Sequence, residues 1–203
     1  MYFPHKRFQL LGSLPFSYHK RIESQQSYAI YGPGDAQIQG SWIAFMTPDS
    51  STSKWKHGLM TGLDLQLPLG NYRQRDPKGT VLPLGFQTGS GSWGAGAHIN
   101  YTLRYKKFGL NLDSRIRVFA QNESSYRPGW RMSQQLQLFY WKQGNNVQWI
   151  PMGGLLLEHY GRDRSFDIPE ATTGGTMAKV SLGLDVYLNR WFISGHWQQA
   201  VWQ

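Results

Sequence analysis

Polar and charged side chains recur at every second position along several runs of this chain, and this spacing could support a chemical function. In residues 97–106, for example, His98 and Arg104 belong to a polar set that alternates with an apolar set. Successive side chains of a β-strand point to opposite faces, so such a run places its polar set on one side. A wall of this kind can guide a small solute without holding it tightly. The residues predicted to form the wall are Asp64, Gln66, His98, Arg104, Asp113, Arg115, Arg117, Lys179, Asp185 and His196.

The arginines of this set indicate which solutes the wall would favour. Arg104, Arg115 and Arg117 fall on two neighbouring runs, so we expect a basic ladder. The ladder would face the acidic residues Asp64, Asp113 and Asp185. Two interpretations stay open: the ladder selects anions, or the charges neutralise one another and fill a narrow, closed lumen.

Residue types used in enzymes are present, but their spacing does not favour catalysis. The six histidines, at positions 5, 19, 57, 98, 159 and 196, show no close metal-ligand spacing. A lipid hydrolase would need a serine, a histidine and an orienting group on neighbouring strands. His98 and Ser114 could be neighbours across a hairpin, but no oxyanion donor is evident. We therefore expect no catalytic residue, no metal and no other cofactor.

The elements that must position these side chains are strands of about ten residues. That length lets a tilted strand cross the hydrocarbon layer of a bilayer. Short turns at 107–109, 143–146 and 189–191 alternate with long polar links at 71–91, 122–131 and 161–176. This asymmetry is typical of an antiparallel up-and-down transmembrane β-barrel, with the long links able to gate it. The predicted strands cover residues 8–20, 36–46, 58–69, 93–106, 110–121, 133–142, 147–160, 178–188 and 192–202.

Composition agrees with this architecture. Hydrophobic residues make up 40 % of the 203 residues, below the roughly 45–50 % of soluble domains, and a polar interior explains the deficit. Nine Trp and eleven Tyr concentrate near the ends of the runs, where aromatic girdles lie in membrane barrels. A soluble β-sandwich with an aromatic core is the alternative. No apolar run approaches the length of about 18 residues that a membrane-spanning helix needs.

Charge and cysteine content exclude other classes. The net charge is +9, but Lys and Arg are scattered singly, so we expect no nucleic-acid partner. There are no cysteines, so strand pairing rather than disulfides must stabilise the fold.

The sequence predicts that residues 1–203 form one domain, which we expect to be truncated at one or both ends. Nine strands is an unusual count for a bacterial barrel, which favours even numbers, so 10–12 strands are expected in the complete protein. Residues 1–7 lack the pattern of a signal peptide. No small-residue or aromatic patch on the apolar faces predicts an oligomer, so a monomer is expected.

Four patches in the loops carry a family resemblance. They are Tyr31-Gly32-Pro33-Gly34-Asp35, Leu65-Gln66-Leu67-Pro68-Leu69-Gly70, Phe86-Gln87-Thr88-Gly89-Ser90-Gly91-Ser92-Trp93 and Thr173-Gly174-Gly175. In this order they resemble the bacterial outer-membrane family called the meta-pathway phenol-degradation transporter family, over residues 8–203. Pro33 replaces a more usual apolar residue, and the family's leader and closing strands are not present. The loop-motif residues are Gly32, Gly34, Asp35, Gly89, Gly91 and Trp93.

The resemblance implies a location in the bacterial outer membrane and passage of small, often aromatic, molecules. We therefore expect a channel or transporter for small aromatic or anionic solutes, with outer-membrane lipid as its other partner. Two alternatives stay open. One is a soluble β-barrel that binds a small hydrophobic ligand with its apolar faces turned inward. The other is a structural outer-membrane barrel with a plugged lumen.

Overall fold

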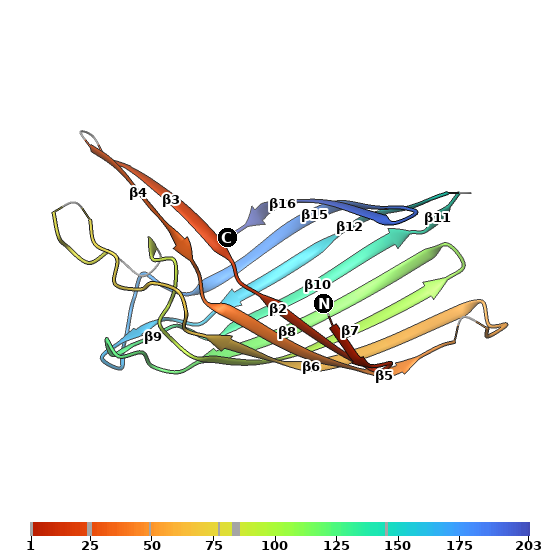
Figure 1. Cartoon of the computed structure of the whole chain (residues 1–203), viewed down its shortest axis with the longest axis horizontal. Coiled ribbons are helices and arrows are strands. Elements are labelled where there is room, and N and C mark those ends of the chain that lie inside the picture. The colour runs from red at the N-terminus through yellow and green to blue at the C-terminus, as the bar shows by residue number, and fades with distance from the viewer. Residues whose placement is uncertain (1, 24–25, 49, 77, 83–85, 145) are drawn as a thin grey trace.

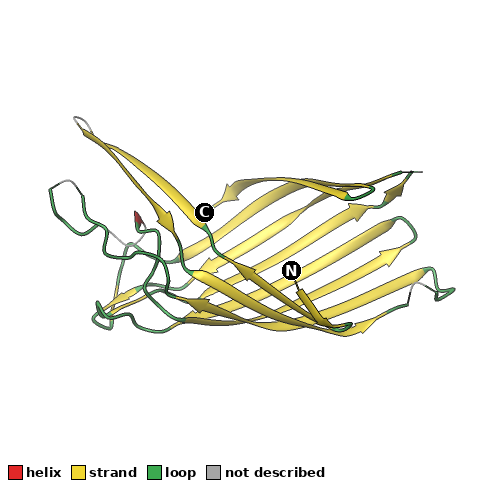
Figure 2. Ribbon diagram, viewed as in Figure 1, coloured by secondary structure: helices red, strands yellow, loops and turns green. Residues whose placement is uncertain are grey.

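The chain folds into antiparallel β-structure (Figures 1 and 2). The computed structural model describes residues 2–23, 26–48, 50–76, 78–82, 86–144 and 146–203. Its main unit is an eleven-stranded sheet in the order β1-β2-β5-β6-β7-β8-β10-β12-β15-β16, with β11 paired to β12. The predicted all-β antiparallel class is therefore confirmed. Within the described ranges, no helix is long and apolar enough to cross a membrane.

Strand positions follow the sequence prediction closely for most of the sheet. The predicted strands at 36–46 and 147–160 coincide with β5 and β12, and six others differ by at most three residues at each end. The strands are β1 (Tyr2–His5), β2 (Phe8–Ser13), β3 (Phe16–Glu23), β4 (Gln26–Pro33), β5 (Ala36–Met46), β6 (Trp55–Leu67), β7 (Gly94–Tyr105), β8 (Phe108–Phe119), β9 (Tyr126–Arg127), β10 (Arg131–Tyr140), β11 (Lys142–Gln143), β12 (Val147–Tyr160), β13 (Arg164–Ser165), β14 (Ile168–Pro169), β15 (Gly175–Leu188) and β16 (Trp191–Trp202).

The prediction of one strand over residues 8–20 is wrong. The chain leaves the main sheet after Ser13, and β3 pairs with β4 in a separate two-stranded hairpin. Pro15 lies at the break and has no N–H to donate to a ladder. Its carbonyl accepts a hydrogen bond from Gly34 N at 2.8 Å instead. Figure 1 shows this hairpin leaving the sheet at the end that carries the long loops.

Short turns and long loops lie at opposite ends of the sheet, as predicted. The turns after β7 and β15 close antiparallel neighbours directly. Asn145, in the predicted turn at 143–146, lies outside the described residues, as do residues 77 and 83–85 of the 71–91 link. Two of the long links, 122–131 and 161–176, contribute to one small sheet in the order β14-β13-β9. These two loops therefore form one unit.

Tyr126 holds this loop unit together. Its phenol donates a hydrogen bond to Asp163, whose other carboxylate oxygen accepts from Gly129 N at 2.7 Å. Burial raises the pKa of Tyr126, and the hydrogen bond to Asp163 raises it further. Since the folded pKa exceeds the unfolded value of about 10, the stability from the neutral phenol is complete below about pH 10 and is lost as the pH rises through the folded value.

Alkaline pH is therefore expected to loosen the loop unit. Above about pH 10, cleavage within residues 161–176 by a protease active at high pH should rise severalfold. Tyr126→Phe removes the titrating group, so its cleavage rate should be higher at neutral pH but nearly independent of pH. An unchanged pH profile in Tyr126→Phe would assign the effect to another group.

The main sheet curls, and its concave face is polar. Arg117 Nη2 donates to Gln37 Oε1 at 3.2 Å, and Arg115 Nη1 donates to Gln39 Oε1 at 3.5 Å. These bonds join β8 to β5 although β6 and β7 lie between them, so the side chains must lie on the inside of the curl. The buried polar residues of the sheet include Ser41, Asp64, Gln66, His98 and Ser181.

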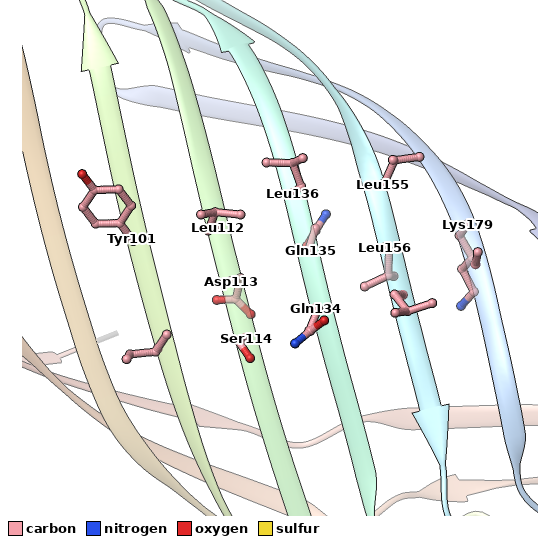
Figure 3. A pocket seen from close by; sticks show the side chains of 13 residues that line it. Tyr101, Leu112, Asp113, Ser114, Gln134, Gln135, Leu136, Leu155, Leu156 and Lys179 are labelled. Atoms are coloured by element: carbon pink, nitrogen blue, oxygen red, sulfur yellow. The ribbon is translucent and has the colours of Figure 1, made fainter.

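The convex face is apolar and exposed. Leu63 and Leu182 are 71 % and 60 % exposed. Tyr101, Leu112, Leu136 and Leu155 form a continuous row across β7, β8, β10 and β12 beside a surface groove of about 610 Å³ (Figure 3). Soluble proteins seldom expose contiguous apolar surface of this kind. The usual distribution of polar and apolar side chains is inverted in this sheet.

Aromatic side chains mark the short-turn end of the convex face. Trp55 packs on Tyr105 with ring centroids 4.6 Å apart, and Phe108 packs on Tyr140 at 5.0 Å. Since Tyr105 and Phe108 are opposite each other in the ladder, the two pairs form one row across β6, β7, β8 and β10. This row is the edge at which the sequence predicts an aromatic girdle.

The described residues do not close a barrel. β1 and β16 are the two ends of the strand order and are not paired with each other. All twelve residues of β16 are exposed. The main unit is thus an open, curled sheet of eleven strands, and the described residues form sixteen strands in all where the sequence predicts nine.

Candidate functional site

The ten residues predicted to line a wall share the concave face of the main sheet. Residues directly opposite each other in a ladder lie on the same face, and the ladders connect the set. His98 is opposite Arg115, and Lys179 is connected to Asp113 through Leu156 and Gln135. The alternation in the sequence therefore predicted the face of each side chain correctly. Passage of a solute along this face stays a prediction.

A buried cluster around His98 is the centre of this face. His98 Nδ1 lies 3.3 Å from Asp64 Oδ2, and its Nε2 lies 2.9 Å from Ser41 Oγ. Gln39 Nε2 is 3.3 Å from the same Nε2. Ser41, His98 and Asp64 are only 1 %, 3 % and 5 % exposed. The cluster joins β5, β6 and β7 through side chains as well as through the ladder.

Gly62 makes room for the His98 ring. A Cβ atom at position 62 would lie 2.5 Å from His98 Cε1 and 2.0 Å from the carbonyl oxygen of Gly40. No side chain fits there without displacing the ring and the neighbouring strand. Sequence reasoning did not single out Gln39, Ser41 or Gly62. The signal was available, because Gln37, Gln39 and Ser41 continue the polar alternation through β5.

The cluster has the connectivity of a serine hydrolase triad without its accessibility. Carboxylate, imidazole and hydroxyl are connected in the order that activates a serine nucleophile. However, Ser41 is almost fully buried, so a substrate carbonyl cannot approach its hydroxyl. We therefore interpret the cluster as a polar network that connects strands. The other pair considered from the sequence is not formed: Ser114 is opposite Ile99, on the convex face, whereas His98 faces inward.

The basic ladder has a different third member from the one predicted. Arg115 Nε lies 3.7 Å from Asp113 Oδ1, and Arg117 is directly opposite Arg131. Arg117 Nε is buried and has no hydrogen-bond partner among the described residues. Two like charges face each other here beside an unsatisfied donor. Arg104 does not take part, because its guanidinium stacks on Trp141 at 4.2 Å from the ring centroid.

Asp185 does not face the ladder, contrary to the prediction. It accepts a hydrogen bond from Ser194 Oγ at 2.6 Å, and its Oδ1 lies 3.4 Å from His196 Nε2. Lys179 pairs with Glu158, at 2.6 Å. These residues belong to β12, β15 and β16 and form contacts separate from those of β5–β8. Of the three acidic residues predicted to face the ladder, only Asp64 and Asp113 lie near it.

The loop motifs converge on the carboxylate of Asp35. Its Oδ2 accepts from Gln66 Nε2 at 3.0 Å and from the amide and hydroxyl of Ser90 at 2.8 and 2.6 Å. Its Oδ1 accepts from Gly70 N at 3.1 Å. These three partners are all distant from Asp35 in the sequence. Three patches that are far apart in the sequence therefore meet at one buried acid.

Glycines allow this convergence. A Cβ at Gly70 would lie 2.6 Å from Gly89 Cα and 2.8 Å from Gly34 C, so three backbones pack in direct contact. Gly91 has φ +65° and lies against the ring of Tyr72. Of the other motif residues, Gly32 faces Thr88, and Trp93 is exposed with its carbonyl accepting from Ala120 N. The motif residues thus shape the loops where the sheet begins.

Neither similarity to known proteins nor a metal-binding group of side chains identifies a function for this site. No family model and no curated protein matches the chain. Within the described ranges, no group of three or more acidic or histidine side chains could hold a metal ion. The family resemblance therefore stays a prediction, and the functional argument rests on the two faces of the sheet.

Proposed function

We propose that this chain forms the wall of a bacterial outer-membrane β-barrel that passes small anionic molecules through its polar interior. The inverted sheet carries this proposal. Leu63 and Leu182 are largely exposed on the outside, whereas His98 is buried on the inside. Burying one leucine side chain is worth about 1.5–3 kcal/mol, so a row of exposed ones is costly in water. Lipid around the convex face would remove that cost.

Strand length and aromatic placement support the same environment. The long strands β5, β6, β7, β8, β10, β12, β15 and β16 have 10–14 residues each, enough to cross the hydrocarbon layer when tilted. The row from Trp55 to Tyr140 lies where such a strand would reach the membrane interface. A soluble ligand-binding barrel would need its apolar side chains turned inward, opposite to this sheet.

The basic residues favour an anionic solute. Arg115, Arg117 and Arg131 lie close together on the concave face, and Arg117 keeps a buried donor free among the described residues. Clustered guanidiniums in a confined polar space attract anions and repel cations. Asp113 and Asp64 offset only part of this charge.

A plugged barrel is the second candidate, and one observation favours it. The bonds from Arg117 to Gln37 and from Arg115 to Gln39 bridge the inside of the curl. Side chains that connect β5 to β8 directly occupy space that a solute would need. The two candidates share the membrane location and differ in conductance.

Conductance in a planar bilayer tests the proposal. The purified chain, refolded in detergent, is expected to insert and to give discrete steps with anion preference. Arg115→Gln combined with Arg117→Gln should reduce that preference at least twofold, because two of the clustered charges are removed. Arg73→Gln combined with Arg75→Gln, in an exposed loop, removes equal charge and is the matched control that should not change it. Insertion without conductance would favour the plugged candidate, and solubility in plain buffer would contradict both.

A further inference from the structure

A basic cavity lies at the long-loop end of the sheet. It has a volume of about 280 Å³, and its lining includes Val118, Trp130, Arg127, Arg162 and Arg164. Three guanidiniums and an indole therefore share one small depression. None of these residues belongs to the predicted wall or to the clusters around His98 and Asp35.

Local pairing brings the three arginines together. Arg127 of β9 is directly opposite Arg164 of β13 in the small loop sheet. The amide of Gly161 donates to the carbonyl of Trp130 at 2.7 Å, which holds the start of the second loop, and with it Arg162, beside the first. Figure 1 shows β9 among the loops at this end of the main sheet. The cavity is thus built by the paired loops rather than by one flexible segment.

The cavity carries unbalanced positive charge. Arg127 Nη2 pairs with Asp167 Oδ1 at 3.0 Å. Arg162 and Arg164 form no ion pair with any residue that the structure describes. Asp163 lies between these two arginines in the sequence, but its carboxylate accepts hydrogen bonds from the Tyr126 hydroxyl and from Gly129 N. Two guanidiniums are therefore free to bind an external anion.

The position of the cavity indicates which anion. Val118 is exposed on the convex apolar face, and Trp130 is exposed beside it. Trp130 also stacks on His159, which points to the convex side of β12, with centroids 4.8 Å apart. The apolar face ends here, and the arginines follow directly. In a membrane, this is the level of the lipid headgroups.

We infer that this cavity binds the phosphate of an anionic membrane lipid. Guanidinium groups bind phosphate oxygens through two parallel hydrogen bonds, and Arg162 and Arg164 supply such donors. Val118 and Trp130 give the attached acyl chains an apolar surface continuous with the convex face. The inference rests on the proposed membrane location, but not on conductance.

Native mass spectrometry of the protein in detergent tests the inference. Phosphatidic acid and phosphatidylcholine are added at equal concentration, and the fraction of protein that retains each lipid is measured. The wild-type protein should retain phosphatidic acid about tenfold more. Arg162→Gln with Arg164→Gln should reduce the ratio to nearly one. Arg73→Gln with Arg75→Gln removes equal charge from another exposed loop and should keep it.

The remaining outcomes show whether the lipid site or the proposed function is wrong. Inorganic phosphate that displaces the lipid at equal concentration would identify a free-phosphate site and overturn the lipid assignment. An equal loss of binding in both double variants would also overturn it, because the effect would then be net charge alone. If the Arg162/Arg164 variant conducts normally but wild type shows no lipid preference, the inference fails and the proposed function stands. Failure of the wild type to insert in bilayers removes the proposed function.

Discussion

Replacing Asp35 with alanine is expected to loosen the 71–91 loop and to lower the free energy of unfolding by about 3–5 kcal/mol. Its carboxylate accepts four hydrogen bonds, two of them from the backbone amides of Gly70 and Ser90. Without it, these buried donors lose their partner, and the three packed backbones lose the acid that they share. Urea unfolding of the detergent-refolded protein, followed by tryptophan fluorescence, measures the loss.

Asp76→Ala is the matched control for this prediction. Asp76 also accepts from two backbone amides, those of Lys78 and Thr80, but in an exposed turn. Water can replace it there, so the expected loss is below about 1 kcal/mol. Equal losses for Asp35→Ala and Asp76→Ala would show that the buried convergence of loops adds no stability beyond a local turn.

His98→Leu is expected to lower the free energy of unfolding by about 3–5 kcal/mol, because it leaves the buried carboxylate of Asp64 without its imidazole partner. Ser41 Oγ would lose its bond to the ring as well. The same urea titration measures this loss. His57→Leu is the control, since His57 also has a hydrogen bond, to Tyr101 at 2.7 Å, but is only partly buried. The His57→Leu substitution should lower the free energy of unfolding by about 1 kcal/mol.

A double variant distinguishes loss of the hydrogen-bond partner from poor packing of the introduced leucine. Removing both polar groups of a buried pair is less costly than removing one. Asp64→Leu with His98→Leu should therefore be more stable than the sum of the two single losses predicts. Additive losses would argue that the pair is not coupled and that the leucine at position 98 simply does not fit against Gly62.

The sequence predicted the faces of the sheet well because strand periodicity is a local property. A residue's side follows from its neighbours at two-residue spacing, so Lys179 and His196 could be placed without knowing the partners of their strands. Strand β12 was predicted to the residue because turn signals bound it, with Gly144 before it and Gly161 after it.

Contacts across the face could not be predicted in this way. The bond between Arg117 and Gln37 depends on the curl of the whole sheet, which no single strand determines. Likewise, Asp185 turned to β16 because Ser194 and His196 lie directly beside it, whereas the ladder is several strands away. The β3–β4 hairpin was missed because its residues continue the alternation of β2, and only Pro15 marks the break.

The sheet topology has a consequence for the order in which the chain folds. From β5 onward, each long strand pairs with the next one along the chain, so the ladder can grow hairpin by hairpin at a small entropic cost. Asp35 instead joins residues that are 31, 35 and 55 positions away. Closing those larger loops costs little additional entropy only once β5, β6 and β7 are already paired. The meeting of the three loop segments at Asp35 is therefore a late event in folding, and it completes the long-loop end after β5, β6 and β7 are in register.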